Sequence, residues 1–447
     1  MRGLRSTIAL LIVLVGLGAY IYFVTWRQDA DTGPKLDEVF ASLEAEDIQA
    51  LQVKSESGEV TSVKREGDAW QIVSPVAVRA SASEVSAITS ALGQLEIVRV
   101  IDENAANLAD YGLDSPRLEI GFTSAADKPS GTLLVGDKTP TGASLYARRN
   151  DEQRVFLIPA YQEGALNKST FDLRDKAVIS FARDKISGVA VNAGGRTIEF
   201  EKRGGEWTLT KPVAARADFG SVEALVGRVE TAQMKSVVAD DSAAADLGKY
   251  GLDRPDVSVI VAMGGEQATL ALGREAGEDA VYARDASRPA VFTVDSALAA
   301  ELKKNADDYR RRDAFEFRAF SADRVEFARS GQTVVFERVK GQGADAQDSW
   351  RRASPNPGDA DKSKVESLLA GLADIRATSF TPSTANTGLN SPALTVSVKF
   401  EGTKEERVTF GTSGQDVFVS RPDEPGAARI EAEKFNEAIK ALDELSK

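Results

Sequence analysis

The chain has 447 residues and a formal net charge of −13, with 42% hydrophobic and 28% charged residues, a composition typical of folded domains. It contains no cysteine and no histidine, which excludes disulfides, thiol catalysis, Cys/His zinc sites and imidazole-dependent triads. Because so acidic a chain repels polyanions, we do not expect it to bind nucleic acid.

An uncharged apolar stretch near the N-terminus, Ile8–Val24, predicts a transmembrane helix. It is close to the ~20 residues needed to cross a bilayer. Arg2 and Arg5 precede it, and aromatic residues including Tyr20 and Trp26 cluster at its far end, as at a membrane interface. The arginines favour an N-in orientation. This predicts a single-pass protein of the cell inner membrane whose remaining residues lie in the periplasm or extracytoplasmic space.

The alternative interpretation of this stretch is a cleaved signal peptide, with Ile8–Val15 as its apolar region and a cleavage site at Gly16-Leu17-Gly18. The mature chain would then begin with the apolar sequence AYIYFVTW, which has no core to join. We therefore favour an uncleaved anchor over residues 1–28, followed by an acidic linker over residues 29–40.

The rest of the chain repeats one pattern three times. Trp70, Trp207 and Trp350 are each followed five residues later by proline and fifteen residues later by valine. Each valine begins an apolar stripe typical of a helix with one buried face. The stripes are Val85/Ile88/Leu92/Leu95, Val222/Leu225/Val226/Val229 and Val365/Leu368/Leu369/Leu372.

Caps for two of these helices are visible in the sequence. Ser81 and Glu84 have the spacing of a capping box in the first copy. In the second copy, Asp218 or Ser221 can cap the helix.

A second block follows each helix and consists of a turn and several strands. After the turn, apolar and polar residues alternate with the period of a half-buried strand. Further short strands are predicted at Leu133–Gly136, Leu270–Gly273 and Val408–Gly411, and then around Tyr146, Tyr282 and Phe418. The turns are Tyr111–Pro116 (YGLDSP), Tyr250–Pro255 (YGLDRP) and Thr387–Pro392 (TGLNSP).

The tryptophans are 137 and then 143 residues apart, a period typical of domains rather than of solenoid repeats. Strands joined by short turns, with helices inserted between them, predict an α+β fold with mainly antiparallel sheets. We assign three tandem repeat domains to residues 41–176, 177–313 and 314–447. The last closes with a helix at Ala432–Leu445.

The positions matched in all three copies are Trp, Pro, Val, Leu and Gly, none of which serves as an acid, a base or a metal ligand. We therefore predict no catalytic residue, no cofactor and no metal site, and interpret acidic pairs such as Glu405-Glu406 as surface charge. A carboxylate-dependent hydrolase is the least favoured alternative.

Two features are candidate ligand or partner contacts. The tryptophans are expected in the core, but Trp350 is expected to be more exposed, because Arg352 replaces the apolar residue found two positions after the other two. The run Arg310, Arg311 and Arg312 is either an anion-binding patch or, as we favour, a solvated interdomain hinge or helix-end charge cluster.

The anchor, the W-x-[IL]-x-x-P strands at Trp70 and Trp207, and the Y-G-L-D-x-P turns at Tyr111 and Tyr250 resemble the bacterial family called domain of unknown function 4340. The resemblance covers about residues 45–447, with Thr387 and Asn390 as departures in the third copy.

The resemblance implies a membrane-tethered envelope protein, often found beside ABC-transporter components, and no established catalytic residues. We therefore expect a non-enzymatic scaffold or accessory component of an ABC-type transport or envelope complex, with transporter subunits as partners. The alternative is an extracytoplasmic binding protein for a lipid, glycan or peptide.

Overall fold

The computed structural model describes residues 36–125, 128–241, 247–341 and 347–446, together with Gly16, Leu17 and Tyr20. The predicted transmembrane segment Ile8–Val24 lies outside the described residues except for those three positions. Within the described part of the chain, no helix combines the length and apolar character needed to cross a membrane. The chain divides into two compact units, Met1–Lys176 and Ala177–Lys447.

The first unit contains the first copy of the repeat, and the second unit contains the other two. The first copy consists of β1 (Ile48–Lys54), β2 (Val60–Glu66), β3 (Ala69–Ser74), β4 (Val78–Arg79), α2 (Ala82–Gly93), β5 (Arg99–Asp102), β6 (Leu118–Ser124), β7 (Gly131–Lys138), β8 (Ser144–Arg149), β9 (Val155–Pro159), α3 (Glu163–Leu166) and α4 (Thr170–Leu173).

The second copy follows the same order of elements. It consists of β10 (Gly188–Ala193), β11 (Arg196–Arg203), β12 (Glu206–Lys211), β13 (Ala215–Arg216), α5 (Phe219–Thr231), β14 (Ser236–Ala239), α6 (Leu247–Tyr250), β15 (Val257–Met263), β16 (Glu266–Glu275), β17 (Ala280–Asp285), β18 (Val291–Asp295) and α7 (Ser296–Leu302).

The third copy differs mainly in its longer closing helix. It consists of β19 (Ala322–Arg329), β20 (Gln332–Val339), β21 (Ser349–Ser354), β22 (Gly358–Ala360), α8 (Lys362–Ala373), β23 (Ala377–Thr381), β24 (Leu394–Phe400), β25 (Lys404–Ser413), β26 (Asp416–Ser420), β27 (Ala427–Ile430) and α9 (Ala432–Leu445).

Each copy builds one nine-stranded antiparallel sheet, and the strand order is the same in all three. The prediction of three tandem α+β repeats is therefore confirmed. The first strand pairs with the sixth at the centre of each sheet, which joins the opening hairpin to the later strands. The orders are β4-β3-β2-β1-β6-β7-β8-β9-β5, β13-β12-β11-β10-β15-β16-β17-β18-β14 and β22-β21-β20-β19-β24-β25-β26-β27-β23.

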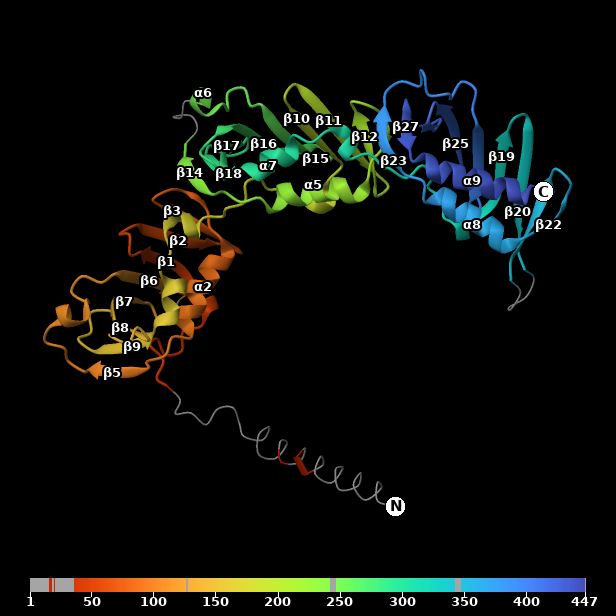
Figure 1. Ribbon diagram of the computed structural model, residues 1–447. Helices are drawn as coiled ribbons and strands as arrows, with labels where there is room; N and C mark the ends of the chain where they lie inside the picture. The colour runs from red at the N-terminus through yellow and green to blue at the C-terminus, as the bar shows by residue number, and fades with distance from the viewer. Residues whose placement is uncertain are drawn as a thin grey trace, which may run out of the picture. The chain divides into compact units, whose positions relative to one another are not determined.

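The helices pack their predicted stripes into the interior of each copy. All twelve stripe residues are buried, from Val85 in the first copy to Leu372 in the third. α8 and α9 lie side by side against the third sheet, and α5 and α7 contact each other in the second copy (Figure 1). The apolar face of each helix therefore closes the core over its own sheet.

The predicted caps are found in part. The Asp218 carboxylate accepts the Ser221 N–H at 2.8 Å, so Asp218 is the N-cap of α5. Ser81 accepts the Glu84 N–H at 3.4 Å, but the Glu84 carboxylate pairs with Lys168 at 2.7 Å. Only one half of the predicted capping box is therefore present.

The glycines of the second block hold a tight contact between a turn and a strand. Gly112, Gly251 and Gly388 have φ values of 65°, 71° and 73°, in the left-handed region that favours glycine. A Cβ atom on Gly273 of β16 would lie 2.1 Å from the Tyr250 carbonyl oxygen of the turn. The recurring glycines are thus explained by backbone geometry.

The first and third copies begin slightly earlier than predicted, whereas the second begins at Ala177, where the corresponding bridge to Gln233 lies. Val39 and Phe40 belong to the first core, and Glu38 forms a bridge with Glu96, so the predicted linker over 29–40 is wrong at its C-terminal end. Asp313 forms the corresponding bridge with Arg376 and therefore belongs to the third copy.

Candidate functional site

The three repeat tryptophans lie in the interiors of their own copies. Trp70 is 9% exposed, Trp207 3% and Trp350 1%, so the core interpretation holds for all three. The expectation that Trp350 is more exposed is wrong. The Arg338 guanidinium covers its ring at 4.8 Å from the centroid, and Arg352 donates to backbone carbonyls at the end of α9.

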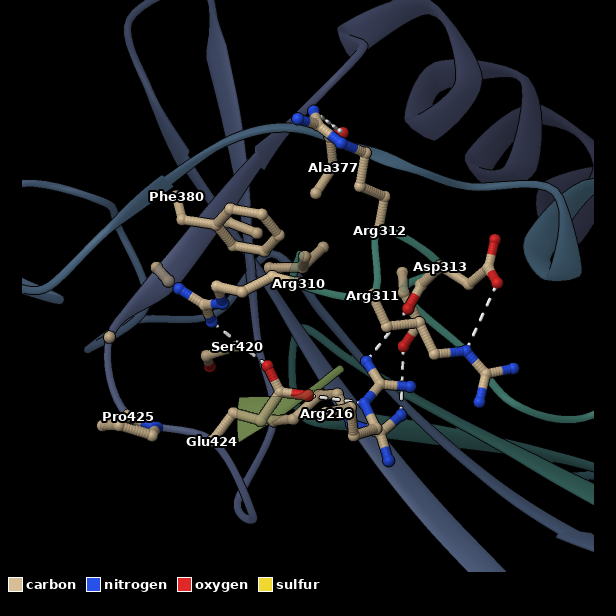
Figure 2. Close-up of a pocket in the computed structure, with 16 residues that line it drawn as sticks. Arg216, Arg310, Arg311, Arg312, Asp313, Ala377, Phe380, Ser420, Glu424 and Pro425 are labelled. Atoms are coloured by element: carbon tan, nitrogen blue, oxygen red, sulfur yellow. Dashed lines mark hydrogen bonds and ion pairs between the residues drawn. The ribbon is translucent and has the colours of Figure 1, made fainter. Parts of the chain in front are cut away.

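The three consecutive arginines connect the second copy to the third. Arg310 forms an antiparallel bridge with Ala217 beside β13, and the Arg311 N–H donates to the Arg216 carbonyl at 2.9 Å. The segment is therefore fixed along the edge of the second sheet before the chain enters the third copy. The side chains of the triplet line a small cavity at this junction (Figure 2).

Arg310 is the buried member of the triplet, with 6% exposure. Its guanidinium lies 3.8 Å from the ring centroid of Phe380 on β23, and its Nη2 donates to the Glu424 carboxylate at 3.2 Å. Arg216 donates to the other oxygen of the same carboxylate (Figure 2). Glu424, from the loop between β26 and β27, therefore joins two cations of the second copy to the third.

The other two arginines also contact the third copy, but are more exposed. Arg311 Nε lies 3.3 Å from the Asp313 carboxylate. Arg312 Nη1 donates to the Thr378 carbonyl at 3.2 Å. The interpretation of the triplet as a solvated hinge is therefore wrong for Arg310, because that side chain is buried and paired across the junction.

The cavity at the junction has a volume of about 30 Å³, above the ~10–15 Å³ that a water molecule needs. It has room for a water-sized group, so a contact between these arginines and a larger ligand or partner stays a prediction. No metal-binding cluster of acidic side chains occurs among the described residues. The charged residues that line the cavity are Arg216, Arg310, Arg311, Arg312, Asp313, Arg421 and Glu424.

A buried ion pair lies beside this cavity, where the sequence predicted surface charge. Glu406 is 6% exposed and accepts the backbone N–H groups of Glu316 at 2.9 Å and Phe317 at 2.8 Å. It also accepts the Arg421 guanidinium at 2.7 Å. The prediction is wrong for Glu406 but right for its exposed neighbour Glu405, because successive residues of a strand face opposite sides.

An arginine tie recurs in all three copies, although the sequence pattern did not reveal it. In each copy, an arginine next to the turn that precedes the last strand donates to a backbone carbonyl at the start of the copy. The number of residues between this arginine and the aromatic residue of the preceding strand differs among the copies. The three arginines therefore do not align when the copies are compared by sequence. The pairs are Arg149–Val39 at 2.8 Å, Arg288–Val178 at 2.6 Å and Arg421–Ala314 at 3.1 Å.

The repeated sheets and the structural use of the recurring residues define a tandem-repeat α+β protein. The chain belongs to the family described as Domain of unknown function (DUF4340), whose profile matches residues 70–208, 207–353 and 350–446. The family predicted from the sequence is therefore confirmed. Each match begins at a repeat tryptophan, so it starts inside a sheet rather than at the start of a copy.

No curated protein matches the chain. The similar solved structures include a DNA polymerase sliding clamp from Pseudomonas aeruginosa with a ligand, at 8% identity over 89% of this chain and 93% of that chain, with a TM-score of 0.15. The DNA polymerase III subunit beta from Pseudomonas aeruginosa matches at 8% identity over 86% of this chain and 93% of that chain, also with a TM-score of 0.15. Scores this low carry no argument about fold or function.

Proposed function

We propose that this protein is a non-enzymatic, single-pass scaffold of the cell envelope and an accessory component of an ABC-type transport complex. The proposal places Ile8–Val24 in the inner membrane and the three copies outside the cytoplasm. The observation that carries it is the structural role of the residues that recur in every copy.

The recurring side chains stabilise the copies themselves. The tryptophans are buried, the glycines fit against turn carbonyls and the arginines tie the start of each copy to a loop. What distinguishes one copy from another is therefore its surface, and a scaffold binds its partners through surfaces.

The junction between the second and third copies supports the same proposal. Glu424 pairs with Arg216 and Arg310 across it, and the side chains of all three are at most 16% exposed. A buried pair of this kind is costly to break. The second and third copies therefore present their outer surfaces in one fixed arrangement, as a scaffold requires.

The location and the partner rest on the sequence. The uncharged stretch Ile8–Val24, preceded by Arg2 and Arg5, has the character of an N-in anchor. Resemblance to the family supports an association with transporter components.

Crosslinking in intact cells, followed by purification through a C-terminal tag, tests the partner. We expect ABC-transporter subunits to be recovered with the full-length chain. The matched control replaces residues 1–28 with a cleavable signal peptide, so that the same copies are exported without an anchor. Recovery of no transporter subunit with the anchored chain would contradict the proposal.

The location is tested separately by fusing alkaline phosphatase, which is active only outside the cytoplasm, to the C-terminus. We expect an active fusion, and we expect N-terminal sequencing of the purified chain to find residues 1–18 retained. A chain that begins at Ala19 would identify a cleaved signal peptide, and an inactive fusion would place the copies in the cytoplasm.

A further inference from the structure

A groove of about 720 Å³ lies on the third copy between the 3-10 turn η7 (Ala319–Ser321) and α8. Arg338 and Glu366 line it. Phe320, which also lines it, is 81% exposed and is the most exposed large apolar side chain in the described part of the chain. The corresponding place in the second copy is filled by the protein itself.

In the second copy this place is occupied by Arg183. The 3-10 turn η5 (Arg183–Lys185) corresponds to η7 by the register of the following strands, so Arg183 takes the position of Ala319. Its guanidinium reaches α5 and donates to Glu223 at 2.8 Å and to Glu230. A cationic side chain from the turn thus closes the space between turn and helix.

The carboxylate that receives Arg183 is fully partnered. Glu223 also accepts hydrogen bonds from Lys202 Nζ at 2.9 Å and from Trp207 Nε1 at 2.8 Å. Lys202 and Arg183 therefore share the Glu223 carboxylate, and Glu230 is a second acceptor for Arg183.

The third copy keeps the carboxylate and lacks the arginine. Glu366 follows the repeat valine of α8 as Glu223 follows that of α5. Among the described residues, its nearest ion pair is Arg338 Nη1 at 4.0 Å. Trp350 Nε1, the counterpart of the Trp207 donor, is buried and has no hydrogen-bond partner within the part of the chain that the structure describes. The charge on Glu366 is therefore far less compensated than the charge on Glu223.

The first copy does not offer this site. In the first copy, Ser86 follows the repeat valine of the helix, and Ala45 begins the corresponding 3-10 turn. This copy therefore has neither the carboxylate nor the arginine. The open groove with a carboxylate in its lining is thus a property of the third copy.

We propose that this groove binds an arginine side chain of a partner protein, which takes the place that Arg183 takes in the second copy. The guanidinium pairs with Glu366, as in a charge-assisted hydrogen bond. The exposed Phe320 ring packs against the side chain and adds a cation–π contact. The net charge of −13 favours a basic partner surface at longer range.

Two cations, Arg338 and Lys362, also line the groove. Arg338 is already engaged, because it covers the Trp350 ring and donates to the Ala319 carbonyl at 2.9 Å. In the second copy, where Lys202 stands in the position of Arg338, the cations Lys202 and Arg183 are received by two carboxylates, Glu223 and Glu230. In the third copy, Arg338 has a second acidic partner in Asp348, at 3.6 Å. The proposal is independent of whether the partner is a transporter subunit.

Fluorine NMR of the full-length, detergent-solubilised protein labelled with 5-fluorotryptophan tests the proposal. The chain has 4 tryptophans, each assigned by its Trp→Phe variant. With N-acetyl-arginine amide as the probe, we expect a saturable shift of the Trp350 signal and no shift of the Trp207 signal, which reports on the filled site. N-acetyl-citrulline amide, which is uncharged, should leave both signals in place.

Two variants identify the contacts. Ala319→Arg should rebuild the arrangement of the second copy and abolish the response of Trp350 to the probe. Glu366→Gln should weaken binding about tenfold or more, because it removes the charge that the guanidinium pairs with. Glu405→Gln, an exposed acid elsewhere on the third copy, is the matched control and should bind as the native chain does.

Several outcomes would overturn the proposal. They are the absence of a saturable Trp350 shift, unchanged binding in Ala319→Arg, and equal responses to the arginine and citrulline probes. A stronger response to N-acetyl-glutamate amide would also overturn it, because the groove would then be an anion site centred on Arg338.

Discussion

Glu223 joins the helix, the tryptophan strand and the 3-10 turn of the second copy. Burial raises the pKa of its carboxyl, but hydrogen bonds from Lys202, Trp207 and Arg183 outweigh burial and lower the pKa to about 2. A carboxyl with a lowered pKa stabilises the fold above the pKa of the unfolded chain. That stabilisation is lost as the pH falls through the folded value.

We expect Glu223→Gln to lower the free energy of unfolding by about 1–3 kcal/mol at neutral pH, because the buried Trp207 donor and two cations lose a charged acceptor. Since the ordinary pKa of this group is 4.5, the native chain should approach the variant in stability as the pH falls from about 4.5 to about 2. Urea unfolding at a series of pH values measures both effects. A constant difference across that range would contradict the assignment, and Glu266→Gln, at an exposed position, is the control.

Trp207→Ala should lower the free energy of unfolding by about 3–5 kcal/mol as a truncation in a core. The loss should appear mainly as unfolding of the second copy. Hydrogen exchange read by mass spectrometry locates the effect, with Trp207→Phe as a milder variant that keeps most of the apolar contact. Unchanged stability would show that the tryptophan does not act as core.

Single residues were predictable where one strand or helix decides their environment. The burial of Trp70 and Trp207 follows from local alternation. The burial of Trp350 does not, because its cover comes from Arg338 on the neighbouring strand. Glu406 was missed for the same reason, since its partners Glu316 and Arg421 are supplied by other segments.

At the scale of elements, the turn after each central helix depends on a glycine on the facing strand. We expect Gly273→Ala to destabilise the chain by about 1–3 kcal/mol, because overpacking has a cost of this size and the added Cβ would overlap the Tyr250 carbonyl.

The matched control for this change is Gly265→Ala, where an added Cβ meets nothing within 4 Å. Thermal unfolding of the two variants measures the difference. Equal effects would show that the close approach of strand and turn is not what requires glycine.

The helices and the long strands were predictable from periodicity, including the closing helix Ala432–Leu445, which matches α9. The edge strands were not. β4 and β13 have only two residues each, too few to show alternation. β5, with the sequence RVID, lies at a sheet edge and carries no apolar stripe. Such strands form because they pair with neighbouring strands, and a local sequence pattern carries no information about that pairing.

At the scale of the whole molecule, the junction of the second and third copies depends on contacts between distant segments. Glu424 is 208 residues from Arg216 and 114 from Arg310 in the sequence. The sequence marked the arginines as a junction feature, but no local pattern links them to a glutamate so far away. The hinge interpretation was wrong for Arg310 because this acceptor was not visible.

We expect Glu424→Gln to weaken the coupling between the second and third copies. Removing one partner of a buried ion pair costs about 3–5 kcal/mol. Calorimetry of the full chain should show the transition of these two copies broaden or split, and proteolysis should begin near residues 310–313. The control is Asp416→Asn, which removes the exposed pair with Arg429. An unchanged transition would show that other contacts hold the junction.

The pairing of the first strand with the sixth bears on how fragments of this protein should be cut. A fragment that follows a family match, such as residues 207–353, begins within β12 and so omits β10 and β11, leaving β15 without its neighbour. It also carries β19 without β24. Both exposed edges invite aggregation, so expression trials should instead cut where one sheet is complete, at the Lys176–Ala177 boundary.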